Sequence, residues 1–198
     1  MDDEGNETSC RLVPPLTYLK RFQGQSFRMP PSSRGSNHPW HSLLCLVSSF
    51  CGMLLVSAIF LDLASDSLFC ASLGATSVLL YGAPSSPLAQ PRNILAGNTI
   101  ASVIGVSLRY AFDSHPHLNW IATALAVSLT IFFMDVTNTM HPPAGATAVL
   151  PIVGTQAMKD LGFLFIVYPV LISESILLLV ALLFNNLFTY RRYPLHWL

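Results

Sequence analysis

The sequence has little charge. Only 10% of its 198 residues are Asp, Glu, Lys or Arg, whereas soluble domains carry about 25%. Ten basic and ten acidic residues also cancel to a net charge of zero, so no basic excess is present for binding nucleic acid. Hydrophobic residues make up 52% of the chain, and the mean hydropathy is +0.53. These values predict a membrane protein that has the lipid bilayer as a partner and no nucleic-acid partner.

The sequence also lacks the usual signatures of enzymes and metal centres. It contains no G-x-S-x-G or H-E-x-x-H pattern, and its four cysteines form no C-x-x-C pair. Two histidines at 115–117 have no third ligand nearby in sequence. We therefore expect no enzymatic activity, no cofactor and no metal. One enzymatic alternative is an intramembrane acid–base pair of Asp135 and His141.

The first 41 residues differ from the rest of the chain. They are rich in Pro, Ser, Gly and Arg, and they hold five of the ten basic and four of the ten acidic residues. This composition predicts a disordered tail at 1–41, followed by a membrane domain at 42–198. No charged segment leads directly into an apolar core before residue 42, so we expect no cleaved signal peptide.

The membrane domain divides into six apolar segments. A helix needs about 20 residues to cross about 30 Å of hydrocarbon. The sequence therefore predicts an all-α, polytopic transmembrane bundle with four long spans and two short helical segments that are broken or re-entrant. The predicted long spans are 42–61, 94–112, a segment that starts at Trp120, and 161–184. The short segments are 68–82 and 144–154.

The two short segments resemble each other. GATSVL at 74–79 and GATAVL at 145–150 differ at one position, and the two copies lie 71 residues apart. An internal repeat is one interpretation, and a chance match is another, because Gly, Ala and Thr are common in membrane helices. If the repeat is genuine, short interrupted segments at corresponding places in two halves indicate the binding site of a transporter.

The distribution of Lys and Arg predicts the orientation. With six crossings, these residues divide eight to two between the sides, and with four crossings they again divide eight to two. Both counts place the two termini in the cytoplasm or its organelle equivalent. They do not identify the membrane, which could be the plasma membrane or an organelle envelope.

The stretch around the second short segment predicts a binding site. Two consecutive prolines disfavour helix before them and suit the first turn of a helix after them. Helix N-termini attract anions, and we expect one such end in each short segment, near Gly74 and near Gly145, with an anion held between them. The glycines allow close backbone approach, and Thr76 and Thr147 supply hydroxyl groups. The alternative is that the small residues only pack helices together. The predicted substrate-binding residues are His141, Pro142, Pro143, Gly145, Thr147, Gly74, Thr76, Arg92 and Asn93.

Ionisable residues in or beside the spans are costly unless they face a cavity or a partner. We therefore predict Asp135, His141 and Glu174 as candidates for proton coupling. Arg92 is a candidate for attracting an anion, or else an ordinary basic anchor. Glycine and alanine recur every four residues at Gly97, Ala101 and Gly105, a pattern that predicts helix packing.

Three motifs resemble those of a known family of membrane proteins. They are PLAQPRN at 87–93, HPPAGATAVL at 141–150 and the closing NNL…RRYP..W. In these motifs the chain resembles the HPP family, which is named after the His-Pro-Pro tripeptide. The resemblance covers residues 42–198 and implies a small polytopic helical protein with a transport role. Plant and cyanobacterial relatives are associated with nitrite transport.

The resemblance therefore implies a transporter or channel for a small inorganic anion such as nitrite. It also marks Gln90, Pro91, Arg92 and Asn93 as a second motif beside the His-Pro-Pro segment. The acidic start of the tail argues against import into plastids. An alternative function is that of a non-transporting assembly subunit whose glycines pack against other subunits. Further copies of this chain, in a homo-oligomer, are one set of such partners.

Overall fold

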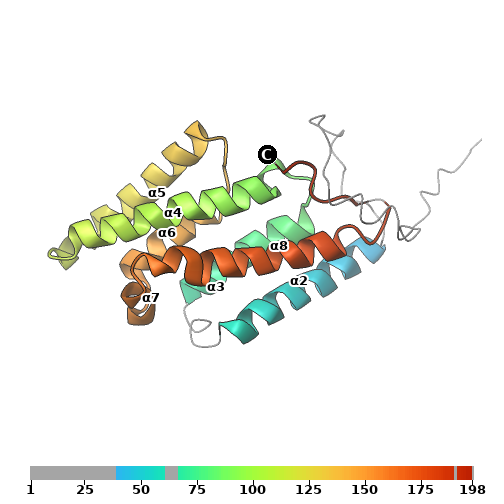
Figure 1. Cartoon of the computed structure of the whole chain (residues 1–198), viewed down its shortest axis with the longest axis horizontal. Helices are drawn as coiled ribbons and strands as arrows, with labels where there is room; N and C mark the ends of the chain where they lie inside the picture. The colour runs from blue at the N-terminus through green and yellow to red at the C-terminus, as the bar shows by residue number, and fades with distance from the viewer. Residues whose placement is uncertain (1–38, 61–66, 190, 198) are drawn as a thin grey trace, which may run out of the picture.

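The computed structural model describes residues 39–60, 67–189 and 191–197. Within these ranges all regular elements are helical, which confirms the predicted all-α class (Figure 1). Most of the predicted tail at 1–41 lies outside the described residues. In chain order the elements are α2 (Pro39–Ile59), α3 (Ser67–Ser77), η1 (Val78–Gly82), η2 (Pro87–Ala89), α4 (Pro91–Phe112), η3 (Pro116–Leu118), α5 (Asn119–Val136), α6 (Ala144–Val153), α7 (Gln156–Asp160), η4 (Ile166–Leu171) and α8 (Ile172–Phe184).

The predicted division into long and short segments is confirmed. Among the described residues, four helical stretches are long and apolar enough to cross a membrane. These are Trp40–Ile59, Pro91–Phe112, Pro116–Val136 and Ile166–Phe184. The two shorter apolar helices are Phe69–Gly82 and Ala144–Val153.

The helices run back and forth along the long axis of the bundle (Figure 1). At one end, the C-terminal segment 191–197 packs on the loop before α4, where the Tyr193 hydroxyl donates to the carbonyl oxygen of Ala89 at 2.7 Å. At the other end, the ring of Tyr110 in α4 stacks on Phe163, with centroids 5.7 Å apart. We call these the C-terminal end and the opposite end of the bundle.

Both short helices carry the chain from one end toward the other. The first starts at the opposite end, where Phe69 of α3 packs edge-on against Phe60 at 6.2 Å between centroids. It finishes at the C-terminal end, where the Arg191 guanidinium donates to the carbonyl oxygen of Tyr81. α6 runs in the other direction, away from the C-terminal end (Figure 1). This path agrees with six crossings rather than with two re-entrant segments.

The basic residues of the described ranges follow the same path. Arg92, Arg191 and Arg192 belong to the C-terminal end, whereas the Arg109 guanidinium donates to the carbonyl oxygen of Lys159 at the opposite end. This arrangement is the one that the six-crossing count expects. The cytoplasmic placement of the C-terminal end stays a prediction.

The last long segment is interrupted, although the sequence predicted one span over 161–184. Tyr168 has an extended backbone, with φ −118° and ψ 117°, just before Pro169. Proline disfavours the helical conformation in the residue before it, which explains the break at this point. The regular helix α8 therefore begins only after the break, and its first turn contains Glu174.

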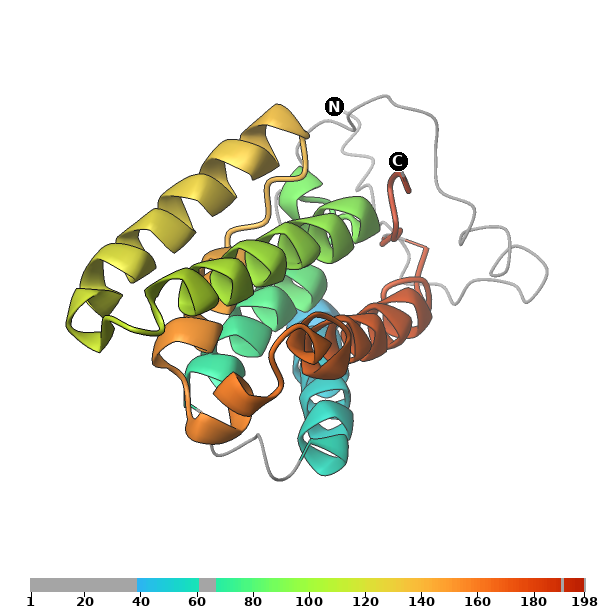
Figure 2. The ribbon, with the colours of Figure 1, turned by 60° about the vertical axis from the view of Figure 1, so that its left-hand side comes forward.

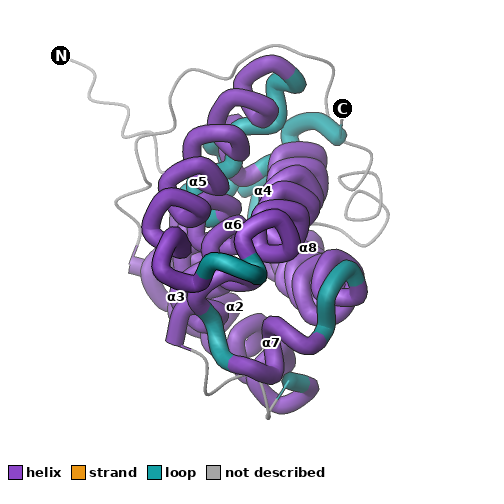
Figure 3. Tube along the Cα trace, turned by 90° about the vertical axis from the view of Figure 1, so that its left-hand side faces the viewer, coloured by secondary structure: helices purple, strands orange, loops and turns teal. Residues whose placement is uncertain are grey.

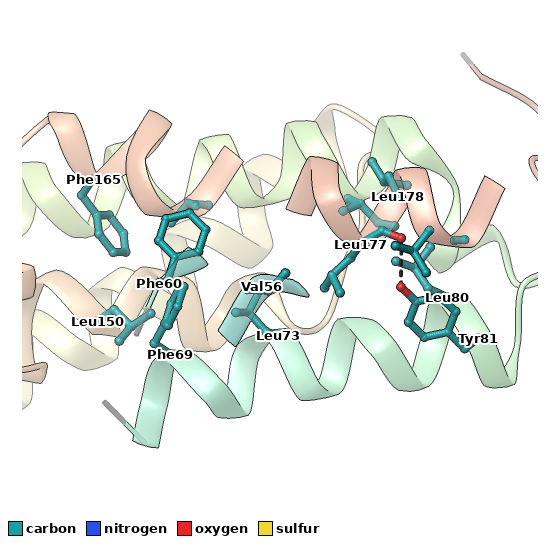
Figure 4. Close-up of a cluster of buried hydrophobic side chains, with 14 of the residues drawn as sticks. Val56, Phe60, Phe69, Leu73, Leu80, Tyr81, Leu150, Phe165, Leu177 and Leu178 are labelled. Atoms are coloured by element: carbon teal, nitrogen blue, oxygen red, sulfur yellow. Dashed lines mark hydrogen bonds between the residues drawn. The ribbon is translucent and has the colours of Figure 1, made fainter. Parts of the chain in front are cut away.

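Two apolar cores hold the helices together. One contains Val56 of α2, Leu73 of α3 and Leu177 of α8, and Figure 4 shows these side chains directed toward one another. In the same core, the Tyr81 hydroxyl donates to the carbonyl oxygen of Leu177 at 3.0 Å. The second core joins α4, α5 and α6 mainly through alanines. α6 contacts α3, α4 and α5, and it lies among them in Figure 3.

The arrangement of the two halves agrees with the predicted repeat. The sequence of long, short and long helices is α2, α3 and α4 in the first half, and α5, α6 and α8 in the second. α4 and α8 run in opposite directions, as do α2 and α5 (Figure 1). Opposite directions of corresponding helices are what an inverted-topology repeat requires.

The glycines of α4 serve packing inside the chain. A Cβ atom on Gly97 would lie 3.0 Å from the Cβ of His141, and one on Gly105 would collide with the carbonyl oxygen of Ala148. The stripe predicted for helix packing therefore faces α6 and the turn before it within the same chain. It provides no argument for packing between subunits.

This contact predicts a difference between two glycine substitutions. Gly105→Ala should lower the free energy of unfolding by about 1–3 kcal/mol, because a backbone carbonyl cannot move aside easily. Gly145→Ala should leave stability unchanged or raise it by up to about 1 kcal/mol, because its Cβ would meet nothing within 4 Å. Denaturant unfolding in detergent measures both values, and equal stability of the two variants would contradict this packing.

Candidate functional site

The chain enters the site through the turn between α5 and α6. α5 ends in a Schellman motif: the Thr139 N–H donates to the carbonyl oxygen of Met134 at 2.8 Å, and the Asn138 N–H donates to that of Asp135 at 3.0 Å. Asn138 has a φ of 53°, a left-handed conformation that asparagine tolerates. From this turn the chain runs back into the bundle as a non-helical segment before α6 begins (Figure 2).

This non-helical segment delivers a buried histidine to the interior. His141 is 0% exposed, and its Nδ1 lies 2.9 Å from the carbonyl oxygen of Leu88. A carbonyl oxygen can only accept a hydrogen bond, so Nδ1 carries a proton and donates it. The second ring nitrogen, Nε2, lies 3.1 Å from the Thr76 hydroxyl oxygen of α3. The loop before α4, the turn before α6 and α3 therefore meet at this imidazole.

His141 belongs to a set of buried polar side chains, which we call the central polar cluster. The cluster draws on four helices and the turn before α6, and each member is at most 2% exposed. Along α3, α4 and α6, the polar residues of the cluster stand between residues that belong to the two apolar cores. The members are Ser72, Thr76, Asn98, His141, Thr147 and Glu174.

Two arms of the cluster meet at one carboxyl oxygen of Glu174. Oε1 lies 3.2 Å from the Thr76 hydroxyl and accepts a hydrogen bond from Nδ2 of Asn98 at 3.1 Å. The oxygen of the same Asn98 amide accepts from the Thr147 hydroxyl at 2.7 Å. The Thr147 hydroxyl in turn lies 2.8 Å from that of Ser72. The cluster thus joins both halves of the chain through residues up to 98 positions apart.

The second carboxyl oxygen of Glu174 is left without a partner. Oε2 is buried and receives no hydrogen bond from the described residues. A buried polar atom without a partner is costly, and natural proteins retain such atoms mainly where a function or a bound guest requires them. Within the central polar cluster, Glu174 is therefore the side chain at which the structure points most directly to a bound molecule or a proton.

The structure corrects the prediction of two helix N-termini. Gly74 lies in the middle of α3, which is continuous from Ser67 to Ser77, so its amide belongs to the helix. The predicted interruption at this point is wrong, because α3 begins earlier in the sequence than the repeat suggested. Thr76 nevertheless reaches the cluster through its side chain.

The first amides of α6 are also occupied. The N–H of Ala144 donates to the carbonyl oxygen of His141 at 3.0 Å, and the N–H of Gly145 donates to that of Pro142 at 3.1 Å. The tight turn formed by the two prolines therefore satisfies the amides that an anion would otherwise bind. The prediction of a helix start after Pro143 is confirmed, whereas its free amide end is not present.

The second motif braces the turn before α6. Asn93 Nδ2 donates to the carbonyl oxygen of Met140 at 2.9 Å, and the exposed Arg92 guanidinium donates to that of Thr137 at 2.9 Å. Arg92 therefore lies at the C-terminal end of the bundle and outside the central polar cluster. Both side chains hold the non-helical segment in place, a role that sequence reasoning had not assigned to them.

Asp135 is not part of the cluster either. It is exposed at the end of α5, whereas His141 is buried and bonded to Leu88 and Thr76. The structure thus does not assemble the acid–base pair of the enzymatic alternative. Of the three proton-coupling candidates, it brings together His141 and Glu174 through Thr76.

Sequence reasoning missed Ser72 and gave Asn98 no role. A polar residue inside an apolar segment was the signal available for both, because such a residue turns toward the interior of a bundle. The missing information was which helices face each other. That follows from contacts between residues 49–98 positions apart, which periodicity along one segment does not encode.

Comparison with known proteins agrees with this architecture. The family model for the HPP transmembrane region matches residues 35–194. A transmembrane protein of Dictyostelium discoideum is 41% identical over 187 residues, and a second one is 37% identical over 185 residues. Both alignments cover 92% of this chain, but only 64% and 58% of these relatives. The chain therefore spans about three fifths of the length of the curated relatives that it matches.

No solved structure matches the chain. The family match covers most of the sequence, and it includes the His-Pro-Pro segment that places His141 in the central polar cluster. The four long apolar helices agree with an integral, multi-pass membrane protein. The chain belongs to the HPP family of transmembrane proteins.

Proposed function

We propose that this protein transports a small inorganic anion, such as nitrite, across a membrane. The observation that carries the proposal is the unpartnered Oε2 of Glu174 within a fully buried polar cluster. Ionisable residues inside membrane bundles are rare and typically mark the path of a substrate or an ion. The cluster lies between the two halves of the fold, where transporters with repeated halves bind their substrates.

The chemistry of the cluster suits a small polar anion. Its hydroxyls, the Asn98 amide and the His141 imidazole all carry hydrogen-bond donors. These donors would exchange their present partners, such as Glu174 and Asn98, for the anion and so replace its hydration shell. An ionised Glu174 would repel that anion at short distance. Transport therefore requires Glu174 to be protonated while the anion is bound, which couples anion movement to a proton.

The non-helical backbone before α6 supports the proposal that this segment moves during transport. Non-helical backbone at membrane depth is tolerated where it is surrounded by protein or lines a hydrated cavity. The segment 137–143 is such a break, and it holds His141 against α3. A small displacement of this segment would separate His141 from Thr76 and open the cluster.

Positive charge at both ends of the bundle is consistent with an anionic substrate. The Arg92 guanidinium is exposed at the C-terminal end, and Arg109 and Lys159 lie at the opposite end. Such charges raise the local concentration of anions. By the positive-inside rule, we propose that the C-terminal end, which holds more of the basic residues, faces the cytoplasm or its organelle equivalent.

Reconstitution tests this function. Purified full-length protein in liposomes is expected to take up nitrite faster than protein-free liposomes. Thr147→Val should lower the uptake, because it removes the hydroxyl that bonds to Asn98. Thr99→Val is the matched control, since the Thr99 hydroxyl donates to the carbonyl oxygen of Leu95 within its own helix α4, at 2.7 Å. Uptake no faster than in protein-free liposomes would contradict the proposal, as would equal effects of the two variants.

A further inference from the structure

The hydrogen bonds around Thr76 contain one proton that two groups can share. Leu88 fixes a proton on Nδ1 of His141, so that the other ring nitrogen faces the Thr76 hydroxyl at 3.1 Å. The same hydroxyl lies 3.2 Å from Oε1 of Glu174. A threonine hydroxyl has a single proton to donate, although its oxygen can also accept one hydrogen bond or more.

Three atoms lie in a row: Nε2 of His141, the hydroxyl oxygen of Thr76 and Oε1 of Glu174. Two arrangements of the protons give each of these atoms a hydrogen-bond partner within the row. In the first, His141 is protonated on Nε2 and donates to the Thr76 oxygen, while Thr76 donates to the Glu174 carboxylate. In the second, neutral His141 accepts from Thr76, while the protonated Glu174 carboxyl donates to the Thr76 oxygen. Both arrangements contain the same number of protons, so they interconvert without any exchange with water.

Losing the shared proton leaves the row incomplete. Neutral His141 then offers a lone pair at Nε2, and Glu174 offers a carboxylate oxygen. Both groups compete for the single proton of the Thr76 hydroxyl. If the hydroxyl donates to Glu174, Nε2 of His141 is left without a donor, and if it donates to His141, Oε1 of Glu174 keeps only the hydrogen bond from Asn98. Losing a buried hydrogen bond is costly. The deprotonated state therefore weakens the contact between α3, α8 and the turn before α6.

We propose that His141, Thr76 and Glu174 form one proton-binding unit, in which the Thr76 hydroxyl passes the coupling proton between the imidazole and the carboxyl group. In this step the Nε2–H bond breaks while the proton moves to the Thr76 oxygen. The original hydroxyl proton moves to Oε1, where a new O–H bond forms, and the hydroxyl is regenerated. The inference rests on the proposed transport function, to which it adds the path of the coupling proton from His141 through Thr76 to Glu174.

The other titratable groups near this unit have separate partners. The Tyr81 hydroxyl of η1 donates to the carbonyl oxygen of Leu177 at 3.0 Å. Burial raises the pKa of Tyr193 well above its ordinary value, and its hydroxyl donates to the carbonyl oxygen of Ala89. From α2, Cys51 is half-buried in the neighbouring apolar core. These groups lie outside the row that joins His141 to Glu174.

Two substitutions of Thr76 test the relay in full-length protein. Liposomes that hold a pH-sensitive dye are given an inward nitrite gradient. Wild-type protein should move protons together with nitrite, and Thr76→Ser should do the same because it keeps the hydroxyl. Thr76→Val has almost the same shape without the hydroxyl, and it should lose the proton movement. Proton movement by Thr76→Val at the wild-type rate would overturn the inference.

The outcomes separate this inference from the proposed function. Nitrite uptake by wild-type protein without proton movement overturns the proton unit and leaves anion transport standing. Absence of nitrite uptake by wild-type protein overturns the transport function itself. In that case infrared spectroscopy still tests the proton unit.

Infrared difference spectra of wild-type protein give a readout that requires neither transport nor a folded Thr76 variant. The carboxyl band of Glu174 is identified as the one that is missing in Glu174→Gln. In wild-type protein this band and the imidazole bands of His141 should change together at a single pH midpoint, because one shared proton is released. Two well-separated midpoints would overturn the shared unit.

Discussion

Glu174→Gln is expected to abolish proton-coupled nitrite uptake while the protein stays folded. Glutamine keeps an oxygen that can accept from Thr76 and from Asn98, as Oε1 of Glu174 does. It cannot, however, bind or release a proton. The neutral amide has almost the same volume, and it avoids the cost of burying a charge. The defect should therefore appear in transport and not in stability.

Uptake in liposomes at several imposed proton gradients measures this effect. Wild-type uptake should rise with an inward proton gradient, whereas Glu174→Gln should show no gradient-dependent uptake. Asp160→Asn makes the same chemical change on an exposed residue that bonds to Gln156 at 2.7 Å, and it should behave as wild type. Gradient-dependent uptake by Glu174→Gln at the wild-type rate would exclude Glu174 as the proton carrier.

Gln90→Leu is expected to lower the free energy of unfolding by about 3 kcal/mol or more, because it leaves several backbone groups unpaired at once. Gln90 is 0% exposed. Its Nε2 donates to the carbonyl oxygens of Pro84 and Ser86 at 3.1 and 2.8 Å, and its Oε1 accepts from the Leu195 N–H at 2.8 Å. This side chain fastens the C-terminal segment to the loop before α4.

Denaturant unfolding in detergent and limited proteolysis both measure the effect of these Gln90 hydrogen bonds. The C-terminal segment of Gln90→Leu should be cleaved faster than that of wild type. Gln156→Leu makes the same change on an exposed residue, and it should alter stability by no more than about 0.5 kcal/mol. If the two variants had equal stability and equal cleavage rates, the hydrogen bonds of Gln90 would have no structural role.

The sequence predicted the helices well because the membrane imposes their length. A segment such as 94–112 has to be apolar over the thickness of a bilayer, and the observed helix Pro91–Phe112 begins at the proline that precedes it. The break at Tyr168 was missed, although Pro169 indicates it locally. Helix existence was thus readable from composition, whereas the continuity of the last span required attention to a single proline.

The site was predicted only in part. His141 and Glu174 were selected as ionisable residues in or beside the spans, and Thr76 and Thr147 as hydroxyls at the expected helix N-termini. All four lie in the central polar cluster. Their arrangement could not be predicted, because it depends on how α3, α4, α6 and α8 pack. The amide end proposed at Gly74 was wrong for the same reason: a repeated hexapeptide does not require that both copies begin a helix.

Two of the four ionisable residues that the sequence placed at the site, Arg92 and Asp135, lie outside the central polar cluster. Arg92 bonds to a backbone carbonyl at the surface, and Asp135 is exposed at the end of α5. Both charges follow the general preference of ionised groups for water. A charged residue at the end of a span was therefore a weaker indication of a buried site than an ionisable or hydroxyl side chain within one, such as Glu174 or Thr147.

Thiol accessibility tests most directly whether the central polar cluster lies on a hydrated path. In an otherwise cysteine-free protein in liposomes, Thr147→Cys should react with a membrane-impermeant thiol reagent, and nitrite should slow the reaction. Ala126→Cys in the apolar core of α5, where the native residue is 0% exposed, should stay protected. Equal protection of both cysteines, with and without a nitrite gradient, would contradict the account.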